Sequence, residues 1–274
     1  MPELPEVETI KNVLKPHIVG LTIENVKINN GSVIARPCAD EFAAKPKGQS
    51  FTDIIRRGKF LIFCLSSGDR LILHLRMTGC LTVATTDEPL TKHTHVVFVL
   101  SDKSELRYED VRRFGKFWLI GKDEKDEFSG IDKLGIEPFD VNFSADYLKR
   151  KILKSKKPIK ELLLDQSIVA GIGNIYSDEI CFAAKIFPYR SGNSLTDDEI
   201  RALYETIPAA LVYFVKTNGI SFEEFNLGKG KNYRNTPYLR VYGKKGQPCP
   251  MCGTPLSGKT ISGRSSVYCP NCQK

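Results

Sequence analysis

The sequence predicts an α+β protein whose strands and helices lie in separate parts of the chain. A helical pattern at the N-terminus is followed, over about residues 21–121, by short runs rich in β-branched and aromatic residues. After Ser144 the periodicity is that of amphipathic helices, and two closely spaced cysteine pairs end the chain. We therefore expect an N-terminal β-sandwich with a flanking N-terminal helix, then a C-terminal helical domain with a helix–two-turn–helix, and finally a metal-binding β-hairpin.

The N-terminal part begins with a helix and continues as strands. Pro5 suits the first turn of a helix, and apolar residues follow on one face until Pro16 and Gly20 end the pattern. Turn-forming residues then separate short β-rich runs, which include residues 60–65, 71–75, 96–100 and 117–120. Such spacing favours a sandwich or a barrel, and we assign this domain to residues 1–132.

Helices predominate after this domain. A helical pattern covers residues 175–185, and Thr196 and Glu199 form a capping box that opens a further helix running towards Thr217. The stretch 228–235 is rich in Gly, Lys and Asn and is predicted to be a mobile loop. We divide this part of the chain into a linker, a helical domain and a terminal module, at residues 133–147, 148–235 and 236–274.

The charge of the chain suits a polyanionic partner. Its 274 residues include 40 Lys and Arg against 32 Asp and Glu, for a formal net charge of +8, although many basic proteins bind nothing in particular. Seven of the residues from Lys149 to Lys160 are basic and none is acidic, which fits a solvated helix face or a nucleic-acid contact. No apolar run approaches about twenty residues and no signal-peptide pattern is present, so we expect a cytoplasmic, nucleoid-associated protein without a membrane partner.

The terminal module carries a metal-binding pattern. Its two pairs, Cys249-x-x-Cys252 and Cys269-x-x-Cys272, have the same internal spacing, and four thiolates complete a tetrahedral Zn²⁺ shell. A redox pair would not need the second pair. Because a shell of four thiolates leaves no open position, the zinc is expected to be structural. The residues between the pairs predict a zinc-finger β-hairpin with Arg264 near its tip, either contacting phosphate or simply exposed to solvent.

The segment from Gln166 to Asn174 joins two helical patterns. Gly171 and Gly173 would let the backbone approach another group closely. Asn174 suits the N-cap of a helix beginning at Ile175, and the free N–H groups of such an N-terminus are a natural phosphate site. An ordinary helical hairpin would contain a similar turn, so the preceding basic run is what favours DNA binding.

The N-terminus offers a nucleophile if Met1 is removed, because Pro2 then becomes a secondary amine. An α-amine has a pKa near ~8, against about 10.4 for lysine, so more of it is neutral at neutral pH. Its condensation with the C1′ carbon of a sugar gives a cationic iminium, which permits β-elimination of the 3′ phosphate. Glu3 and Glu6 could transfer the protons. Alternatively, Pro2 and Pro5 only stiffen the start of the helix.

A series of separated motifs resembles, in the same order, those of the bacterial formamidopyrimidine-DNA glycosylases, the 8-oxoguanine DNA glycosylases. The resemblance covers essentially the whole chain, from the opening MPELPEVET to the cysteine tail. It implies a bifunctional DNA glycosylase and abasic-site lyase with one structural zinc, acting as a monomer on double-stranded DNA. The matching segments are residues 1–9, 56–60, 74–79, 110–115, 164–176 and 269–273.

The resemblance implies roles for individual residues by position. Pro2 matches the Schiff-base nucleophile, and Glu3 matches the catalytic acid and base. Lys59 matches a lysine that contacts phosphate beside the lesion and assists elimination, and Arg264 matches a phosphate-binding arginine of the catalytic centre. Glu6 matches a carboxylate in the damaged-nucleoside pocket.

The resemblance also implies a set of side chains that fill the void left by the flipped base: Met77, Arg112 and Phe114. Methionine and phenylalanine can wedge into a base stack, and arginine can hydrogen-bond the orphaned cytosine. From the residues alone, these would equally be a core methionine, a surface arginine and a core phenylalanine. The remaining implied DNA contacts are His74, His93, Lys156 and Asn174. A metal role for His93 with His95 is disfavoured because no third ligand is evident.

Two other functions stay open. An endonuclease VIII-type glycosylase would prefer oxidised pyrimidines, but Leu4, the intact void-filling set and the thiolate zinc site argue against it. A non-catalytic zinc protein that senses damaged DNA would need no free amine. The sequence departs from the family pattern at Val111, where proline is usual, and at Phe187, where histidine is frequent. The stretch 218–235 falls where the family has the loop that covers the extruded base, and it is less typical.

Overall fold

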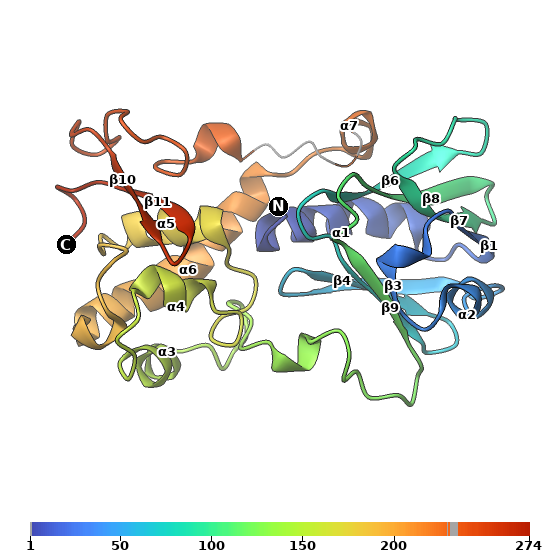
Figure 1. Ribbon diagram of the computed structural model, residues 1–274. Coiled ribbons are helices and arrows are strands. Elements are labelled where there is room, and N and C mark those ends of the chain that lie inside the picture. The colour runs from blue at the N-terminus through green and yellow to red at the C-terminus, as the bar shows by residue number, and fades with distance from the viewer. Residues whose placement is uncertain (1, 229, 231–234) are drawn as a thin grey trace. The chain divides into compact units, whose positions relative to one another are not determined.

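The chain forms two compact units in the computed structural model, which describes residues 2–228, 230 and 235–274 (Figure 1). No helix among these residues combines the length and the apolar character that crossing a membrane requires. Among the described residues, the first unit comprises Pro2, Glu6–Asp132 and part of Gly219–Tyr233, and the second comprises Glu3–Pro5, Lys133–Asn218 and part of Arg234–Lys274.

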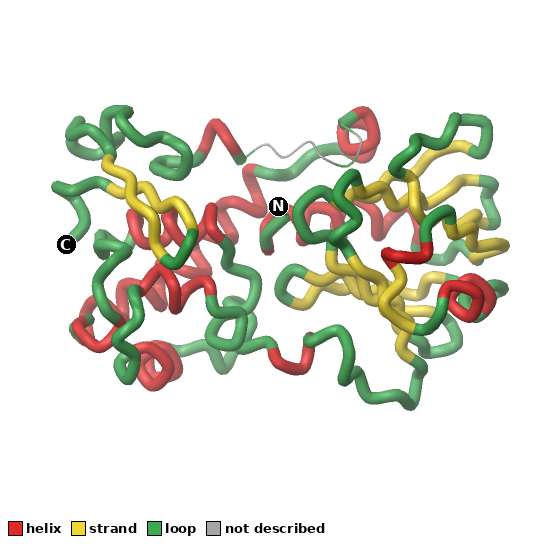
Figure 2. Tube along the Cα trace, in the orientation of Figure 1, coloured by secondary structure: helices red, strands yellow, loops and turns green. Residues whose placement is uncertain are grey.

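Strands dominate the first unit (Figure 2). They form two sheets, one with the order β1-β7-β8-β6 and one with the order β2-β9-β5-β4-β3. All pairings are antiparallel except that of β2 with β9. In chain order the elements are α1 (Leu4–Ile18), β1 (Ile23–Ile28), η1 (Gly31–Val33), β2 (Ile34–Arg36), α2 (Ala39–Ala44), β3 (Phe51–Arg57), β4 (Phe60–Leu65), β5 (Arg70–His74), β6 (Gly79–Thr85), β7 (Thr94–Leu100), β8 (Ser104–Asp110), β9 (Lys116–Ile120) and η2 (Ile131–Lys133).

The two sheets pack face to face around one apolar core. Phe98 of β7 contacts Phe51 of β3 and Phe117 of β9, with ring centroids 6.3 and 6.2 Å apart. Because these rings come from different sheets and are at most 1% exposed, they fill the space between the layers. The predicted sandwich is therefore confirmed.

Helix α1 contributes its apolar face to the same core. Val7, Ile10 and Leu14 are fully buried there, as the periodicity predicts. Pro16, however, does not end the helix, which continues to Ile18. The helix ends two residues after this proline, which has no backbone N–H to donate.

The second unit is built from helices and a terminal hairpin. Helix α6 opens with the predicted capping box of Thr196 and Glu199, with both reciprocal bonds formed, and runs to Thr217 as expected. A core separate from that of the sandwich gathers residues of α3 to α6. In chain order the elements are α3 (Ala145–Ile152), α4 (Ile159–Leu164), α5 (Asn174–Ala183), η3 (Gly192–Ser194), α6 (Asp197–Thr217), η4 (Thr236–Tyr238), β10 (Ser257–Ile261) and β11 (Arg264–Tyr268).

A short helix between α6 and η4 belongs to the first unit and was not predicted from sequence. It is α7 (Phe222–Leu227), which opens with a capping box of Ser221 and Glu224. The Phe222 ring stacks on His17 of α1 at a centroid distance of 3.6 Å. The predicted mobile loop at 228–235 falls largely outside the described residues, since it includes residue 229 and residues 231–234.

Candidate functional site

The N-terminal segment places a carboxylate directly after Pro2. Pro2 is buried, and Glu3 is only 1% exposed. The Glu3 carboxylate accepts backbone hydrogen bonds from Gly173 at 2.8 Å, Ile175 at 3.0 Å and Tyr176 at 3.4 Å. All of these donors lie at the N-terminus of α5, where the helix dipole favours negative charge. Residue 3 is therefore fixed by main-chain donors that no side-chain motion can withdraw.

The turn before α5 is shaped to receive this segment. A Cβ on Gly173 would lie 2.3 Å from the Glu3 carboxyl carbon, and a Cβ on Gly171 would lie 2.6 Å from the Leu4 side chain. The side chain of Gln166 holds the turn closed, donating to the Ile172 carbonyl and accepting from the Gly171 amide. The predicted close approach is real, and its partner is the N-terminal segment of the same chain.

The predicted N-cap at this turn is wrong. Helix α5 begins at Asn174 itself, and Gly173 is its N-cap. The N–H groups of Ile175 and Tyr176 are bonded to Glu3 rather than left open for phosphate. The Asn174 side chain is half-buried, and its Oδ1 has no hydrogen-bond partner among the described residues. Oδ1 is an acceptor and cannot bind a phosphate, so the Nδ2 of this side chain is its donor suited to a phosphate contact.

The hairpin tip presents Arg264 to solvent. Ser262 and Gly263 have φ angles of 46° and 77°, the left-handed pair that a two-residue hairpin turn requires. They connect Ile261 to Arg264, which pair across the strands. Arg264 is exposed at the start of β11, so the predicted hairpin and the position of this arginine near its tip are both observed.

Lys160 joins the hairpin to the helices, a function that sequence reasoning missed. Its ammonium group and the Asp178 carboxylate are 2.7 Å apart and fully buried. Lys160 also donates to the Ser265 carbonyl, while Asp178 accepts from Ser266 and from the Val267 amide. Burial raises the pKa of Asp178, and these donors offset part of the rise. The signal in the sequence was a lysine in a short, largely apolar helical stretch, IKELLL, whose other charged residue is Glu161.

The rest of the basic run is mostly solvent-facing. Lys149 pairs with Asp197 at 2.7 Å and Lys157 with Glu161 at 2.8 Å. Lys156 is exposed in the connection between α3 and α4. These lysines are accessible to solvent, as both a solvated face and a nucleic-acid contact require, while Lys160 is a structural residue.

The four cysteines of the terminal module converge. Their sulfur atoms all lie within 4.8 Å of one another, with 3.9 Å between Cys249 and Cys272 and 3.5 Å between Cys252 and Cys269. A tetrahedron with Zn–S bonds of about 2.3 Å has sulfurs about 3.8 Å apart, so the set fits one Zn²⁺. The module binds one structural zinc through four thiolates.

In the first unit, Lys59 and His74 lie close enough to interact electrostatically. Lys59 follows Gly58 in the turn between β3 and β4, where Gly58 has a φ of 56°. Burial, then the charges of Arg76 and Lys59, lower the pKa of His74 to about 3. The Arg76 amide donates to His74 Nδ1 at 3.0 Å. His74 is therefore a neutral imidazole whose Nε2 carries the proton. Its Nε2–H group can donate a hydrogen bond to a phosphate oxygen.

The three predicted void-filling residues lie on exposed loops. Met77 is 45% exposed and Phe114 is 49% exposed, which excludes the alternative of two core residues. The Arg112 guanidinium lies 4.5 Å from the centre of the Phe114 ring. Exposed apolar side chains beside an arginine are suited to insertion between bases.

Glu6 and His93 occupy less distinctive surroundings. Glu6 is 3% exposed on α1, and His93 is half-buried with its carbonyl accepting from the Asp110 amide. His95 is buried, and its Nε2 lies 2.7 Å from the Asp110 carbonyl oxygen. This hydrogen bond to the main chain indicates a structural role for His95, not a metal-binding one.

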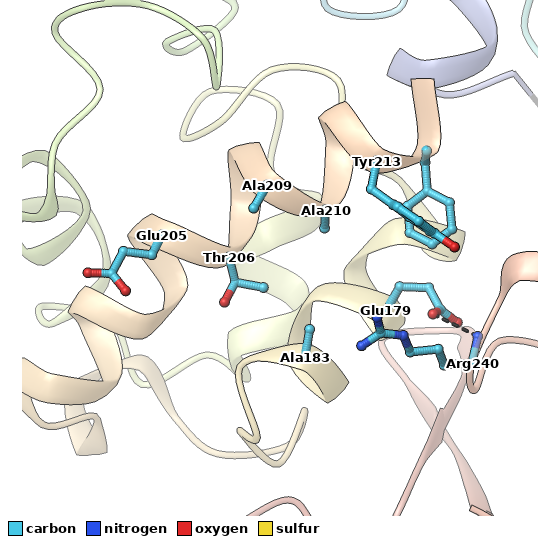
Figure 3. A pocket seen from close by; sticks show the side chains of 9 residues that line it. Glu179, Ala183, Glu205, Thr206, Ala209, Ala210, Tyr213 and Arg240 are labelled. Atoms are coloured by element: carbon cyan, nitrogen blue, oxygen red, sulfur yellow. Dashed lines mark hydrogen bonds between the residues drawn. The ribbon is translucent and has the colours of Figure 1, made fainter. Parts of the chain in front are cut away.

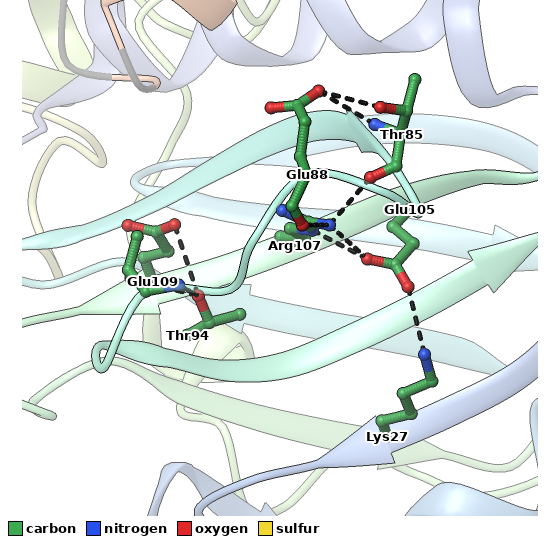
Figure 4. Close-up of polar contacts among 8 residues, drawn as sticks. Lys27, Thr85, Glu88, Thr94, Glu105, Arg107 and Glu109 are labelled. Atoms are coloured by element: carbon green, nitrogen blue, oxygen red, sulfur yellow. Dashed lines mark hydrogen bonds and ion pairs between the residues drawn. The ribbon is translucent and has the colours of Figure 1, made fainter.

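Other buried charges of the sandwich form a stabilising network (Figure 4). Glu105 bridges Arg107 at 2.7 Å and Lys27 at 3.2 Å. Arg107 also donates to the carbonyls of Thr85 and Glu88. Its hydrogen bonds hold β8 to neighbouring segments.

A pocket in the second unit lies away from the candidate residues. It has a volume of about 420 Å³ between α5 and α6, and the Glu179 carboxylate in its wall is bonded to the amides of Arg240, Val241 and Tyr242 (Figure 3). None of the predicted site residues lines it. We therefore assign it no part in the site.

The chain matches known proteins along its full length. Family models match as the formamidopyrimidine-DNA glycosylase N-terminal domain over residues 1–117, the H2TH domain of the same glycosylases over 134–226, and a zinc finger found in FPG and IleRS over 246–274. The formamidopyrimidine-DNA glycosylase of Geobacillus kaustophilus is 46% identical over 275 residues, with 100% of both chains covered. That of Desulforamulus reducens is 43% identical, covering 100% of this chain and 99% of its own.

Solved structures agree. Lactococcus lactis Fpg in complex with DNA containing an abasic site is 36% identical, with a TM-score of 0.91 and 99% of both chains covered. The same protein in complex with Fapy-dG DNA has the same identity and TM-score, with 99% and 100% covered. A further structure holds DNA with an oxidised pyrimidine, at 36% identity, a TM-score of 0.91 and 100% coverage of both chains.

Proposed function

Because the chain belongs to the formamidopyrimidine-DNA glycosylase family, we propose that it excises oxidised purines from duplex DNA and then cleaves the strand. Its substrates are 8-oxoguanine and formamidopyrimidines, released in base-excision repair. The observation that carries the proposal is the Glu3 carboxylate, held by three main-chain donors immediately after Pro2.

Pro2 is the nucleophile of the reaction once Met1 is removed. Its secondary amine attacks C1′ of the damaged nucleotide, the C1′–N bond to the base breaks, and the base leaves with a proton. The C1′–O4′ bond of the sugar then breaks, O4′ takes up a proton, and C1′ and the Pro2 nitrogen form the iminium. This iminium withdraws electrons from C2′, so a C2′ proton is lost and the 3′ phosphate departs. A second elimination releases the 5′ phosphate. Glu3 transfers protons in these steps, since its carboxylate is fixed one residue from the amine.

The other residues bind and position the substrate. Lys59 and the neutral His74 contact phosphate beside the lesion, and Glu6 faces the damaged nucleoside. In the second unit, the Asn174 amide and the exposed Arg264 hold the backbone. The exposed side chains of Met77, Arg112 and Phe114 fill the space that the extruded base leaves. Weaker contacts come from His93 and Lys156.

The enzyme is proposed to act as a monomer on nucleoid DNA in the bacterial cytoplasm. Its parts are a catalytic sandwich at residues 1–132, a linker at 133–147, a helical DNA-binding domain within 148–235 and a zinc-finger hairpin at 236–274. The expected helical domain of 148–235 is too long, because helix α7 groups with the sandwich.

A competition experiment tests the lesion class. Duplexes containing 8-oxoguanine or thymine glycol, each opposite its normal partner, are mixed in equal amounts and limiting enzyme is added. We expect the 8-oxoguanine strand to be cleaved first. Preferential cleavage of thymine glycol would instead assign the chain the specificity of an endonuclease VIII-type glycosylase, and cleavage of neither would support a non-catalytic DNA-binding protein.

Gly173→Ala is expected to slow base release about hundredfold, the cost of misplacing a catalytic group by about 1 Å. The new Cβ would lie 2.3 Å from the Glu3 carboxyl carbon, so the carboxylate must move. Single-turnover kinetics on 8-oxoguanine DNA measures the effect. Gly121→Ala is the matched control, because its Cβ would meet Glu124 at an ordinary 3.7 Å. Equal rates for the two variants would show that the position of Glu3 is unimportant.

Zinc removal is expected to weaken duplex binding at least about tenfold while leaving the sandwich folded. The core of the terminal module is small and includes Cys249 and Cys269 themselves, so without metal the hairpin that carries Arg264 should unfold. The sandwich has its own core. Fluorescence anisotropy of labelled DNA, combined with hydrogen exchange of both units after chelation, measures the two effects. Unfolding of the sandwich by chelation would contradict this modular behaviour.

A further inference from the structure

Two short loops of the sandwich share one buried polar centre. Residues 75–78 connect β5 to β6, and residues 111–115 connect β8 to β9. The flanking strands pair on both sides, with Gly79 opposite Asp110 and His74 opposite Lys116. Each loop therefore connects one sheet to the other, and the two loops lie side by side.

The Asp110 carboxylate is bonded to both loops. Its Oδ1 accepts from the Thr78 hydroxyl at 2.5 Å and from the Arg112 amide at 3.1 Å. Its Oδ2 accepts from the Gly115 amide at 2.9 Å and from the Tyr108 hydroxyl at 3.0 Å. Asp110 is fully buried, and these donors lower the pKa of the carboxyl even though burial alone would raise it. Four donors saturate a carboxylate, so the centre has a single arrangement.

The Tyr108 hydroxyl fills the space between the loops. A Cβ on Gly115 would lie 1.9 Å from the hydroxyl oxygen, and a Cβ on Gly79 would lie 2.8 Å from it. The hydroxyl alone excludes a side chain at Gly115. At Gly79 a side chain is excluded by the Leu75 carbonyl oxygen, 2.5 Å from the Cβ position, together with the hydroxyl. The Tyr108 ring is fully buried against Phe117, with centroids 5.0 Å apart, so the hydroxyl is held rigidly.

Both loops contain a backbone conformation that needs such support. Arg76 and Arg113 have φ angles of 54° and 57°. These angles lie in the left-handed region, which residues other than glycine seldom adopt. Each strained residue adjoins an exposed apolar side chain, Met77 in one loop and Phe114 in the other.

We propose that Asp110 and Tyr108 form a positioning centre that couples the two loops, so that Met77, Arg112 and Phe114 enter the DNA together as one rigid unit. This inference rests on the proposed void-filling role of those three side chains. Asp110 and Tyr108 do not touch DNA. They fix the loops in the inserting conformation before DNA binds. The conformational entropy of the loops is therefore lost when the protein folds and not when the base is extruded.

The test compares two substrates in single-turnover experiments. An 8-oxoguanine duplex requires extrusion of a base, whereas a duplex with a preformed abasic site has no base to extrude. The main variant is Tyr108→Phe, which keeps the ring and removes one charge-assisted hydrogen bond, and Asp110→Asn is the stronger companion. Tyr147→Phe is the matched control, because that hydroxyl bonds the Ile168 carbonyl in the second unit at 2.8 Å. The triple variant Met77→Ala/Arg112→Ala/Phe114→Ala is measured with and without Tyr108→Phe.

We expect Tyr108→Phe to slow release of 8-oxoguanine about tenfold, the factor that corresponds to one hydrogen bond to a charged acceptor. Cleavage at the abasic site should slow less than about threefold, and in the triple-alanine background Tyr108→Phe should have no further effect. Equal slowing on both substrates, or undiminished slowing in that background, would show that Tyr108 only stabilises the fold and would overturn the inference. If the triple variant itself released 8-oxoguanine at the wild-type rate, the void-filling role would be the part that fails.

Discussion

A chain that retains Met1 ahead of Pro2 is expected to form no borohydride-stable adduct with 8-oxoguanine DNA. With Met1 in place, the Pro2 nitrogen is part of a peptide bond and cannot attack C1′. Base release should fall by at least about 10³-fold, as it does when a covalent nucleophile is removed from other enzymes. Borohydride trapping on a denaturing gel measures adduct formation, and intact-mass analysis identifies the N-terminus of each preparation.

The control for this experiment is the same chain with Met1 removed, since the two preparations differ only at the terminus. Pro2→Gly adds a second comparison, because it replaces the secondary amine with a primary one and removes the obligatory iminium charge. An adduct on the Met1-retaining chain would assign the nucleophile to another amine, either the α-amine of Met1 or a lysine, and peptide mapping would distinguish the two, with Lys59 the first lysine to examine. Equal trapping by Pro2→Gly would show that the secondary amine is not required.

Local patterns predicted most of the fold. The apolar spacing of α1 and the capping box of α6 depend on residues close together in the chain, and both elements form as expected. The same rule could have found α7, whose capping box of Ser221 and Glu224 was overlooked. Pro16 was expected to end the first helix, which instead continues for two more residues, to Ile18.

The site was predicted less completely, because its geometry depends on contacts between distant residues. Gly173 was recognised as a place of close approach, but only the fold shows that Glu3 is the group approaching it. Lys160 was one of a run of basic residues until the structure showed it buried against Asp178. The sequence left Met77 and Phe114 equally consistent with core residues, and their exposure settled that alternative.

Glu3→Gln is expected to reduce base release about 10²- to 10⁴-fold, the usual contribution of a positioned acid–base group. Glutamine has nearly the same shape, but it cannot take up and return a proton. Its amide nitrogen must also face either the Ile175 amide or the amides of Gly173 and Tyr176, which now donate to the carboxylate. Both effects act on the step in which the base leaves. Single-turnover release of 8-oxoguanine measures the loss.

The nucleophile survives this substitution, and that separates a chemical defect from a folding defect. A preformed abasic site carries an aldehyde and needs no departing base, so Glu3→Gln should still form the borohydride-trapped adduct there. Glu8→Gln is the matched control, since it makes the same chemical change on α1, five residues further along the chain, at a carboxylate that pairs with Arg56 at 2.7 Å. We expect its base-release rate to stay within about threefold of wild type, the range of a modest ion-pair loss. If Glu3→Gln released 8-oxoguanine as fast as Glu8→Gln, the carboxylate at the α5 N-terminus would be a structural anchor for the N-terminal segment and the proton transfers would belong to another group.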